Sequence, residues 1–324
     1  MAVKKQGVLV VNLGSPDKAT VWAVRRFLKQ FLSDPRVVNL PRFLWWGILN
    51  FFILPFRPFK SVQAYREIWT KQGSPLIVLT ESLVAKLVKH YKKEPAVSIK
   101  AAMSYGNPAL ASALREFKKE EVEQLIVIPL YPQYSSTTTA SVFDVVTQEL
   151  QQWRYIPEVN FISDYHQNPV YIKVLADSVR AAWADKPKNE LLLMSFHGLP
   201  AQLTKWGDPY FHQCHATAEL IAEALELDSS EWEIVFQSRF GRAKWLQPYC
   251  IETLMQLPKQ GHVQVDIICP GFAVDCLETL EEINMTNKSI FLEAGGEEYR
   301  YIPALNDAQG NVELMIDLIN KKRQ

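Results

Sequence analysis

Short apolar runs of strand length alternate with longer stretches of helical periodicity along the whole chain. This alternation is typical of parallel βαβ construction, because each crossover between parallel strands needs a helix-length connection. The same order of elements occurs twice, and the third and fourth apolar runs are separated by about thirty residues in both halves. The pattern predicts strands at 7–13, 99–104, 125–130 and 159–162, and corresponding strands at 191–196, 234–238, 265–269 and 299–303.

The repeat predicts an α/β fold with two similar Rossmann-like domains, each a four-stranded parallel sheet flanked by helices. A chain of 324 residues exceeds what one hydrophobic core usually supports. We expect an N-terminal domain at 1–165 and a C-terminal domain at 166–324, with an active-site cleft between them. Residues 310–322 carry apolar side chains on one helical face, which predicts a closing helix that can pack back on the first domain.

One segment of the first half, Phe43 to Phe56, is almost wholly apolar and lies between Arg42 and Arg57. It is too short for a helix that crosses a hydrocarbon core of roughly 30 Å. One interpretation is a buried core helix. The other is a hydrophobic lip at 40–60 that lines a ligand cleft and touches a membrane surface, because tryptophans and flanking cations suit the headgroup region.

Charge and motifs exclude several classes of function. The 35 basic residues balance 35 acidic ones, so the electrostatic footprint of a nucleic-acid-binding protein is missing. No Gly-x-Gly-x-x-Gly follows the first strand, and no P-loop motif occurs, which removes the usual support for a nucleotide site. The serine-hydrolase motif Gly-x-Ser-x-Gly and the zinc-protease motif His-Glu-x-x-His are also missing.

Composition and cysteine usage indicate an intracellular globular protein. The chain is 48% hydrophobic and 22% charged, which is typical of a folded protein and not of a disordered one. The first residues lack the layout of a signal peptide, so we expect a cytoplasmic location. The four cysteines contain no Cys-x-x-Cys pair, which favours reduced thiols over a disulfide framework or a zinc ribbon.

Two short runs place titratable groups where predicted strands end. One contains His197, and the other contains Asp275, Glu278 and Glu282. Open α/β sheets bind ligands at this edge. In an ordinary helix the three carboxylates would lie within roughly 60° on one face. A neutral imidazole accepts protons near neutral pH and carboxylates bind divalent cations, so one cleft could deprotonate a nitrogen ligand while a metal enters.

Each of these groups also has a simpler explanation. His197 could be a structural histidine, and acidic residues are favoured in the first turn of any helix by the helix dipole. The dipole explains one or two acids but not three on one face. We therefore favour a functional role for Asp275 and Glu282, whereas Glu281 points away from that face.

Several runs along the chain together resemble the ferrochelatase family, whose members insert ferrous iron into a porphyrin at the end of haem synthesis. The resemblance covers nearly the full length, and its motifs are highly specific as a set although each is weak alone. The matching runs are VNLGSP at 11–16, GSP at 73–75, YPQYS at 131–135, SFHGLP at 195–200, GDPY at 207–210, QSR at 237–239 and DCLETLEE at 275–282.

The resemblance implies roles for the polar groups of the second half. His197 corresponds to the histidine that faces the porphyrin core as proton acceptor and metal contact. Glu278 corresponds to its catalytic partner and second metal contact across the macrocycle. Asp275 and Glu282 match acidic positions that lead metal or protons between this glutamate and solvent. In related chains this stretch can contain a wide π-type turn, which would rotate the carboxylates away from their ordinary-helix positions.

For the porphyrin, the resemblance places propionate contacts at Arg57, Tyr65 and Ser74. An arginine with hydroxyl donors suits a carboxylate, although Arg57 could equally be a cation at a membrane edge. Serine and threonine residues after the third strand could also be helix caps. The remaining positions that match the substrate pocket are Leu13, Tyr131 and Ser135.

The resemblance predicts a lyase that forms protohaem from Fe²⁺ and protoporphyrin IX, with no cofactor beyond the substrate Fe²⁺. A [2Fe-2S] cluster is not expected, because the cysteines have no suitable spacing. Cys276 stands where many relatives have histidine, which changes one candidate ligand of the metal path to a thiol. We expect a monomer that binds no nucleic acid and contacts the cytoplasmic membrane peripherally through 40–60.

Two alternative functions remain open from the sequence. The first is a chelatase for another tetrapyrrole, coproporphyrin or sirohydrochlorin, and the second is a haem or metal carrier that catalyses nothing. The apolar segment favours protoporphyrin, because a substrate with extra carboxylates would need more basic residues around its cleft.

Overall fold

The structure is a computed structural model that describes residues 4–241 and 243–323. It divides into two compact units. Unit 1 comprises the chain up to Asp164 together with the stretch from Met315 onward, and unit 2 comprises Tyr165–Leu314. The sequence predicted a division after residue 165, and the end of the closing helix belongs to unit 1.

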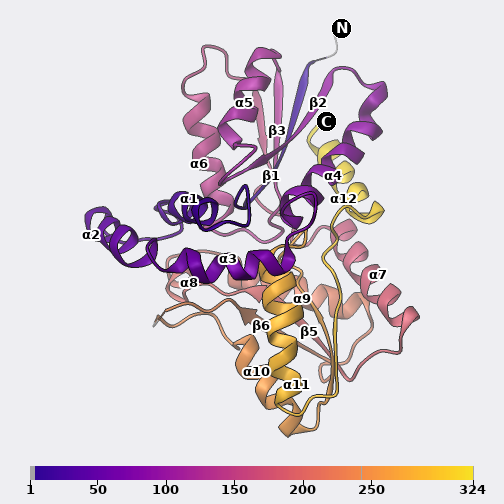
Figure 1. The fold of residues 1–324 in the computed structure, drawn as a ribbon. Coiled ribbons are helices and arrows are strands. Elements are labelled where there is room, and N and C mark those ends of the chain that lie inside the picture. Colours follow the sequence, from indigo (N-terminus) through magenta and orange to yellow (C-terminus); the bar gives the residue numbers. More distant parts are fainter. Residues whose placement is uncertain (1–3, 242, 324) are drawn as a thin grey trace. The chain divides into compact units, whose positions relative to one another are not determined.

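Unit 1 contains a parallel four-stranded sheet in the order β2-β1-β3-β4. Its inner strands β1 and β3 are almost completely buried, because helices cover both faces of a parallel sheet. In Figure 1, α5 and α6 lie on one face, and α4 and the end of α12 lie on the other. The strands are β1 (Gln6–Asn12), β2 (Val97–Met103), β3 (Gln124–Pro129) and β4 (Glu158–Phe161).

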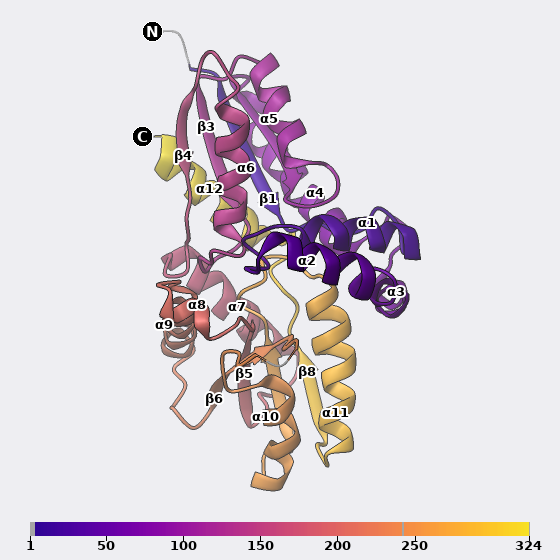
Figure 2. The same cartoon turned by 90° about the vertical axis from the view of Figure 1, so that its left-hand side faces the viewer.

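The helices of unit 1 provide the apolar faces that cover this sheet. Phe117 of α5 and Val146 of α6 pack on Leu9, Val11 and Val127 of the strands. Figure 2 shows α1, α2 and α3 grouped together within this unit. The helices are α1 (Val21–Leu32), α2 (Arg42–Ile48), η1 (Leu49–Ile53), α3 (Arg57–Ile68), α4 (Pro75–His90), η2 (Tyr91–Lys93), α5 (Leu110–Lys119) and α6 (Thr139–Leu150).

Unit 2 repeats the architecture with a parallel sheet in the order β6-β5-β7-β8. Helices α10 and α11 cover one face, and α7 and α9 pack together on the other (Figure 1). Its strands are β5 (Leu191–His197), β6 (Trp232–Gln237), β7 (Gln264–Ile268) and β8 (Glu298–Tyr301). Its helices are α7 (Pro169–Asp185), α8 (Gln202–Lys205), α9 (Tyr210–Ala224), α10 (Cys250–Gln256), η3 (Leu257–Gln260), η4 (Glu278–Asn287), α11 (Lys288–Glu293) and the start of α12 (Gln309–Arg323).

The two sheets confirm the fold class and the repeat predicted from the sequence. The first strand of each half occupies an inner position between the second and third strands, and the fourth strand forms an edge. Strand ends differ from the predicted ones by a few residues, because backbone pairing continues past the apolar run in β5 and stops earlier in β8.

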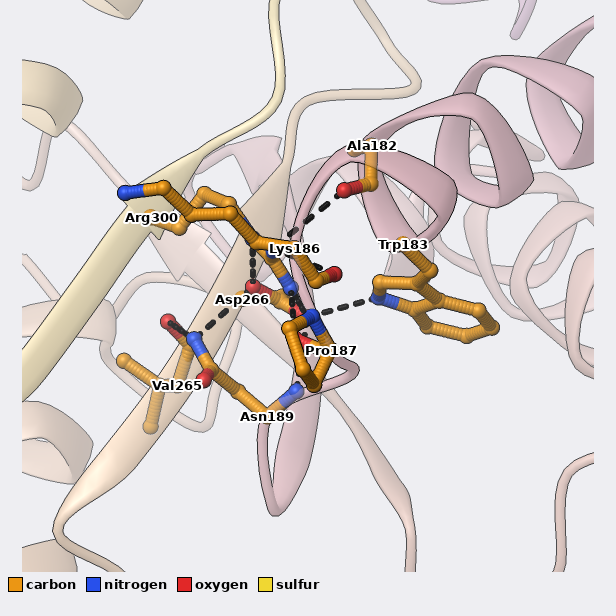
Figure 3. A network of polar contacts seen from close by, with 8 residues as sticks. All are labelled: Ala182, Trp183, Lys186, Pro187, Asn189, Val265, Asp266 and Arg300. Atoms are coloured by element: carbon orange, nitrogen blue, oxygen red, sulfur yellow. Dashed lines mark hydrogen bonds and ion pairs between the residues drawn. The ribbon is translucent and has the colours of Figure 1, made fainter.

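A buried ion pair fastens the edge strand β8 of unit 2 (Figure 3). Asp266 of β7 and Arg300 of β8 are register partners, and Arg300 Nε donates to Asp266 Oδ1 at 2.6 Å. The guanidinium also donates to the carbonyls of Ala182 and Lys186 near the end of α7. Asp266 accepts further hydrogen bonds from Trp183 and Asn189. The pair therefore joins β7, β8 and the end of α7.

The apolar segment of the first half is not a buried core helix. It forms α2 and the π-helix η1, and only Trp45, Leu49 and Leu54 within it are buried. Most of its aromatic side chains are more than half exposed to solvent, so the core-helix interpretation is wrong for Phe43, Trp46, Phe51, Phe52 and Phe56. Among the described residues, every helix is too short or too polar to span a membrane.

Candidate active site

The candidate active site lies in unit 2, where β5 and β6 end. His197 is the last residue of β5 and pairs in register with Gln237, the last residue of β6. The next residue is glycine for a steric reason: a Cβ on Gly198 would lie 2.6 Å from the carbonyl oxygen of Gln237. The backbone at the end of β6 thus passes directly against Gly198, the residue after His197.

The His197 ring has a defined tautomer in this position. Its Nδ1 lies 2.6 Å from the carbonyl oxygen of Gly198. A carbonyl only accepts hydrogen bonds, so Nδ1 must carry the proton. Neutral His197 therefore keeps its lone pair on Nε2, the atom that would act as base or as metal ligand. The rings of Trp245 and Phe272 flank the imidazole with centroids 6.5 and 6.4 Å away.

The acidic segment forms a π-helix, as the family resemblance implied. Glu278 is the first residue of η4, and Glu282 follows within it. Asp275 precedes the helix altogether. The ordinary-helix prediction that Asp275, Glu278 and Glu282 share one narrow face is therefore wrong, because one residue lies outside the helix and the others lie on a wider turn.

Asp275 is held by an almost complete set of hydrogen bonds. It is 5% exposed. Oδ1 accepts from Thr279 at 2.8 Å, from the Tyr301 hydroxyl at 2.5 Å and from the Ala304 amide at 3.4 Å. Oδ2 accepts from Asn306 at 2.7 Å. This carboxylate ties the start of η4 to the chain that follows β8.

Glu282 contacts the end of β6, whereas Asp275 contacts the chain around the end of β8. The Ser238 amide donates to Oε1 at 2.7 Å, and the Ser238 hydroxyl donates to Oε2. Ser238 adopts a left-handed φ of 63°, a conformation that costs free energy in a residue other than glycine and that directs both donors at the carboxylate. Burial raises the pKa of Glu282, and Glu278 adds to the increase, whereas Ser238 and His197 oppose it.

Two polar residues beneath the site were not assigned a role from the sequence. Gln237 is 2% exposed and Ser195 is completely buried. The Ser195 hydroxyl donates to Gln237 Oε1 at 2.8 Å. Gln237 Nε2 donates to the carbonyl of Glu278 at 2.9 Å and to Glu282 Oε2 at 3.5 Å. Ser195 begins the SFHGLP motif and Gln237 begins the QSR motif, and these positions were the sequence signal that could have identified them.

Cys276 does not resemble a replacement ligand for a metal. It is 4% exposed, and burial raises the pKa of its thiol, so a neutral thiol is favoured over a thiolate. All four cysteines are free and buried. Among the described residues, no group of three or more histidine, cysteine, aspartate or glutamate side chains is arranged to hold a metal ion.

Three of the predicted substrate residues follow the inner strands of unit 1. Leu13 comes directly after β1, and its carbonyl accepts from the Tyr105 amide at 2.9 Å. Tyr131 follows β3 and packs against the core of the unit. Ser135 is completely buried, and its hydroxyl accepts from the Thr137 amide at 3.1 Å. This last contact supports the alternative in which Ser135 shapes the turn into α6.

The other three predicted substrate residues lie on α3 and α4 of unit 1. Arg57 begins α3 and is partly exposed. Tyr65 is buried in the same helix, with its ring 6.2 Å from that of Trp69. Ser74 precedes α4, but its hydroxyl makes no capping hydrogen bond to the helix. Its side chain therefore does not act as an ordinary helix cap.

Comparisons with known proteins agree on one family. The family model named Ferrochelatase matches residues 5–323. The chain is 51% identical to the ferrochelatase of Methylococcus capsulatus over 97% of this chain and 96% of that protein. It is 47% identical to a protein of Streptococcus mutans named coproporphyrin III ferrochelatase, over 99% of this chain and all of that one.

A solved structure supports the fold independently of sequence. SirB from Bacillus subtilis with Fe³⁺ has a TM-score of 0.58 and covers 98% of this chain and 95% of its own. At 10% identity this likeness concerns the fold alone. The family model and the curated relatives span nearly the full length, and on that basis the chain belongs to the ferrochelatase family.

Proposed function

We propose that the protein is a ferro-lyase that inserts Fe²⁺ into protoporphyrin IX to form protohaem, the terminal step of haem biosynthesis. The observation that carries this proposal is the His197 site. An imidazole with its lone pair on Nε2 stands at the end of β5, in the electrostatic field of the partly buried Glu282 carboxyl group. Base and acidic groups in one place suit the exchange of two pyrrole protons for one metal ion.

In this mechanism His197 and Glu278 act as the catalytic pair. The neutral Nε2 of His197 accepts one pyrrole proton, and Glu278 accepts the other, while the two pyrrole nitrogens acquire bonds to Fe²⁺. Charge and atoms balance, because two protons leave as one divalent cation enters. Each residue can contact the metal only before it takes up its proton, because the lone pair on Nε2 of His197 serves one of the two at a time. Histidine and carboxylate are suitable ligands for ferrous iron.

We propose that Glu282 lies on the route between Glu278 and solvent for protons or iron. The predicted place of Asp275 on the same route stays a prediction. Its four accepted hydrogen bonds favour an anchoring role, because a metal ligand would have to give up some of them.

For the substrate, we propose that Arg57, Tyr65 and Ser74 contact porphyrin propionates. Leu13, Tyr131 and Ser135 contribute to the same recognition. A charge-assisted hydrogen bond from arginine to a carboxylate is among the stronger polar contacts. Binding free energy from these contacts can be used to distort the macrocycle, which exposes the nitrogen lone pairs to the incoming ion.

We propose a cytoplasmic monomer whose exposed apolar segment contacts a membrane surface. Phe51 and Phe52 are 63% and 70% exposed, and aromatic side chains of this kind bind at the lipid headgroup level. Co-sedimentation with phospholipid vesicles tests this location. The double substitution of Phe51 and Phe52 by serine should reduce binding, whereas Phe143→Ser, which removes an exposed aromatic side chain from α6, should not.

Anaerobic absorbance spectroscopy of the purified protein with Fe²⁺ and protoporphyrin IX tests the activity. The wild type should convert free porphyrin to metalloporphyrin far faster than buffer. His197→Ala should lower the rate by about 100-fold or more while porphyrin binding persists, because a positioned base contributes about 10²–10⁴. Equal rates for the wild type and buffer would contradict the proposal.

Coproporphyrin is the second candidate substrate, because the Streptococcus mutans relative is named for it. The same assay with coproporphyrin III separates the two, and sirohydrochlorin with Fe²⁺ or Co²⁺ completes the series. A higher kcat/KM for coproporphyrin would replace protoporphyrin in the proposal. Tight porphyrin binding without metal insertion into any of the three would favour a carrier instead.

A further inference from the structure

Gln237 lies between β5, which carries His197, and η4, which carries Glu278. Ser195 lies two residues before His197 on β5, so both side chains leave the same face of the strand. Gln237 accepts from Ser195 on one side and donates to Glu278 and Glu282 of η4 on the other. The chain of contacts thus runs from the strand of His197 to the helix of Glu278.

The amide orientation of Gln237 follows from its partners. Oε1 faces two donors, the Ser195 hydroxyl at 2.8 Å and the Cys269 thiol at 3.7 Å. Nε2 faces two acceptors, the Glu278 carbonyl and the Glu282 carboxylate. A flipped amide would place Oε1 against the Glu278 carbonyl, acceptor against acceptor. The Glu278 carbonyl therefore selects this orientation, and Ser195 supplies the donor that Oε1 then needs.

The two contacts on η4 constrain the helix in two ways. The bond to the Glu278 carbonyl fixes the backbone of the residue that carries the proposed catalytic carboxylate. The contact with Glu282 lies further along the helix and fixes its rotation. A π-helix needs such support, because its wide turn is rarely stable for long on its own.

We infer that Gln237, hydrogen-bonded to Ser195, is a positioning residue that sets where Glu278 and Glu282 stand relative to His197. The inference rests on the proposed function, since it assigns Gln237 to the same metal-insertion site. In this role Gln237 acts through η4 and contacts neither the porphyrin nor the iron. Supporting residues of this kind typically change activity by about 10–100-fold when they are removed.

Steady-state kinetics of Gln237→Met test the inference. Methionine keeps the length and burial of the side chain but removes both amide contacts. We expect kcat to fall by about 10–100-fold with the KM for porphyrin unchanged, because porphyrin contacts are untouched. Thr217→Val is the matched control: it removes a completely buried hydroxyl, which donates to the carbonyl of His166 within the same unit, and should keep the wild-type kcat.

A double-mutant cycle separates positioning from general destabilisation. Ser195→Ala should lower kcat in the wild-type background and have a much smaller effect in the Gln237→Met background, because the Ser195 hydroxyl donates to Gln237. Independent losses in the two backgrounds would overturn the inference, as would a wild-type kcat in Gln237→Met. If Gln237→Met does not fold, Ser195→Ala alone decides, since a wild-type kcat there also overturns it. An inactive wild type would instead contradict the proposed function.

Discussion

Unit 1 and unit 2 have the same sheet topology but different chemistry at the ends of their strands. In unit 1 the residue after β1 is Leu13, and the loop after β3 carries hydroxyl groups such as that of Ser135. In unit 2, β5 ends in His197 and the segment after β7 leads to Glu278. The comparison separates what the fold requires from what the reaction requires.

Glycine after the first strand is the feature that both units share. A Cβ on Gly14 would lie 1.8 Å from the carbonyl oxygen of Tyr105, and one on Gly198 would meet the carbonyl of Gln237. In both units the chain leaving the neighbouring strand passes against this glycine. The close backbone approach is therefore a requirement of the fold that both units share. The basic His197 and the acidic Glu278 and Glu282 occur in unit 2.

Alanine at the two glycines tests this shared feature, and the substitution of Gly14 should have the largest effect on stability. Gly14→Ala combines the backbone clash with a φ of +105°, so we expect a loss of about 4 kcal/mol in unfolding free energy. Gly198→Ala, without the unfavourable φ, should cost about 2 kcal/mol. Urea unfolding measures both. Gly47→Ala in α2, where a Cβ meets nothing within 4 Å, should be neutral or stabilising.

The ion pair between Asp266 and Arg300 is not repeated at the equivalent positions of unit 1. The register partners Asp266 and Arg300 correspond to Ile126 and Asn160, which pair in the same place between β3 and β4. Arg300→Leu should cost about 3 kcal/mol, because Asp266 would remain buried without its cation. The double variant Asp266→Ile, Arg300→Asn introduces the unit 1 pair. Its cost in urea unfolding should be less than the sum of the two single costs, and additive costs would show that the pair is not coupled.

Arg57→Gln tests whether unit 1 contributes to substrate binding. Loss of the proposed propionate contact should raise the KM for porphyrin about 10-fold with little change in kcat. Arg66→Gln, which removes an exposed arginine from the last turn of the same helix, is the control and should leave both constants unchanged. An equal effect of the two substitutions would favour the alternative in which Arg57 is only a surface cation.

The smallest expected effect is the pH dependence that Glu282 adds to stability. Burial raises its folded-state pKa, so above the ordinary value near 4.5 the folded protein holds a proton that the unfolded chain has released. This contribution therefore lowers stability as the pH rises through the folded pKa. The stability of Glu282→Gln relative to the wild type should therefore increase as the pH rises above about 4.5 and be constant below it. Urea unfolding across this range measures it, and a pH-independent difference would contradict the assignment.

Much of the fold could be predicted from hydrophobic periodicity because the sheets are parallel and buried on both faces. Such strands read as continuous apolar runs, and all eight predicted ranges overlap strands of the structure. The geometry of the acidic segment could not be derived in this way. Residue spacing assumes an ordinary helix, whereas Glu278 and Glu282 lie on a π-helix and Asp275 lies outside it.

The exposed segment and the buried polar network show two further limits of the sequence. Apolar content could not decide whether Phe43 and Phe51 are buried, because burial depends on which tertiary surface covers them. Gln237 and Ser195 could not be assigned from spacing, since their partners lie about forty residues away in the chain. Only the folded backbone brings these side chains together.

The most direct test of the central claim is a single-turnover measurement on Glu278→Gln and Glu281→Gln. Both variants remove one carboxylate from the same π-helix, but Glu281 bonds to Thr286 and not to the groups around His197. With porphyrin bound in advance and Fe²⁺ added anaerobically, the account predicts that Glu278→Gln loses about 100-fold or more in rate while Glu281→Gln keeps the wild-type rate. A wild-type rate for Glu278→Gln, or an equal loss in both variants, would contradict it.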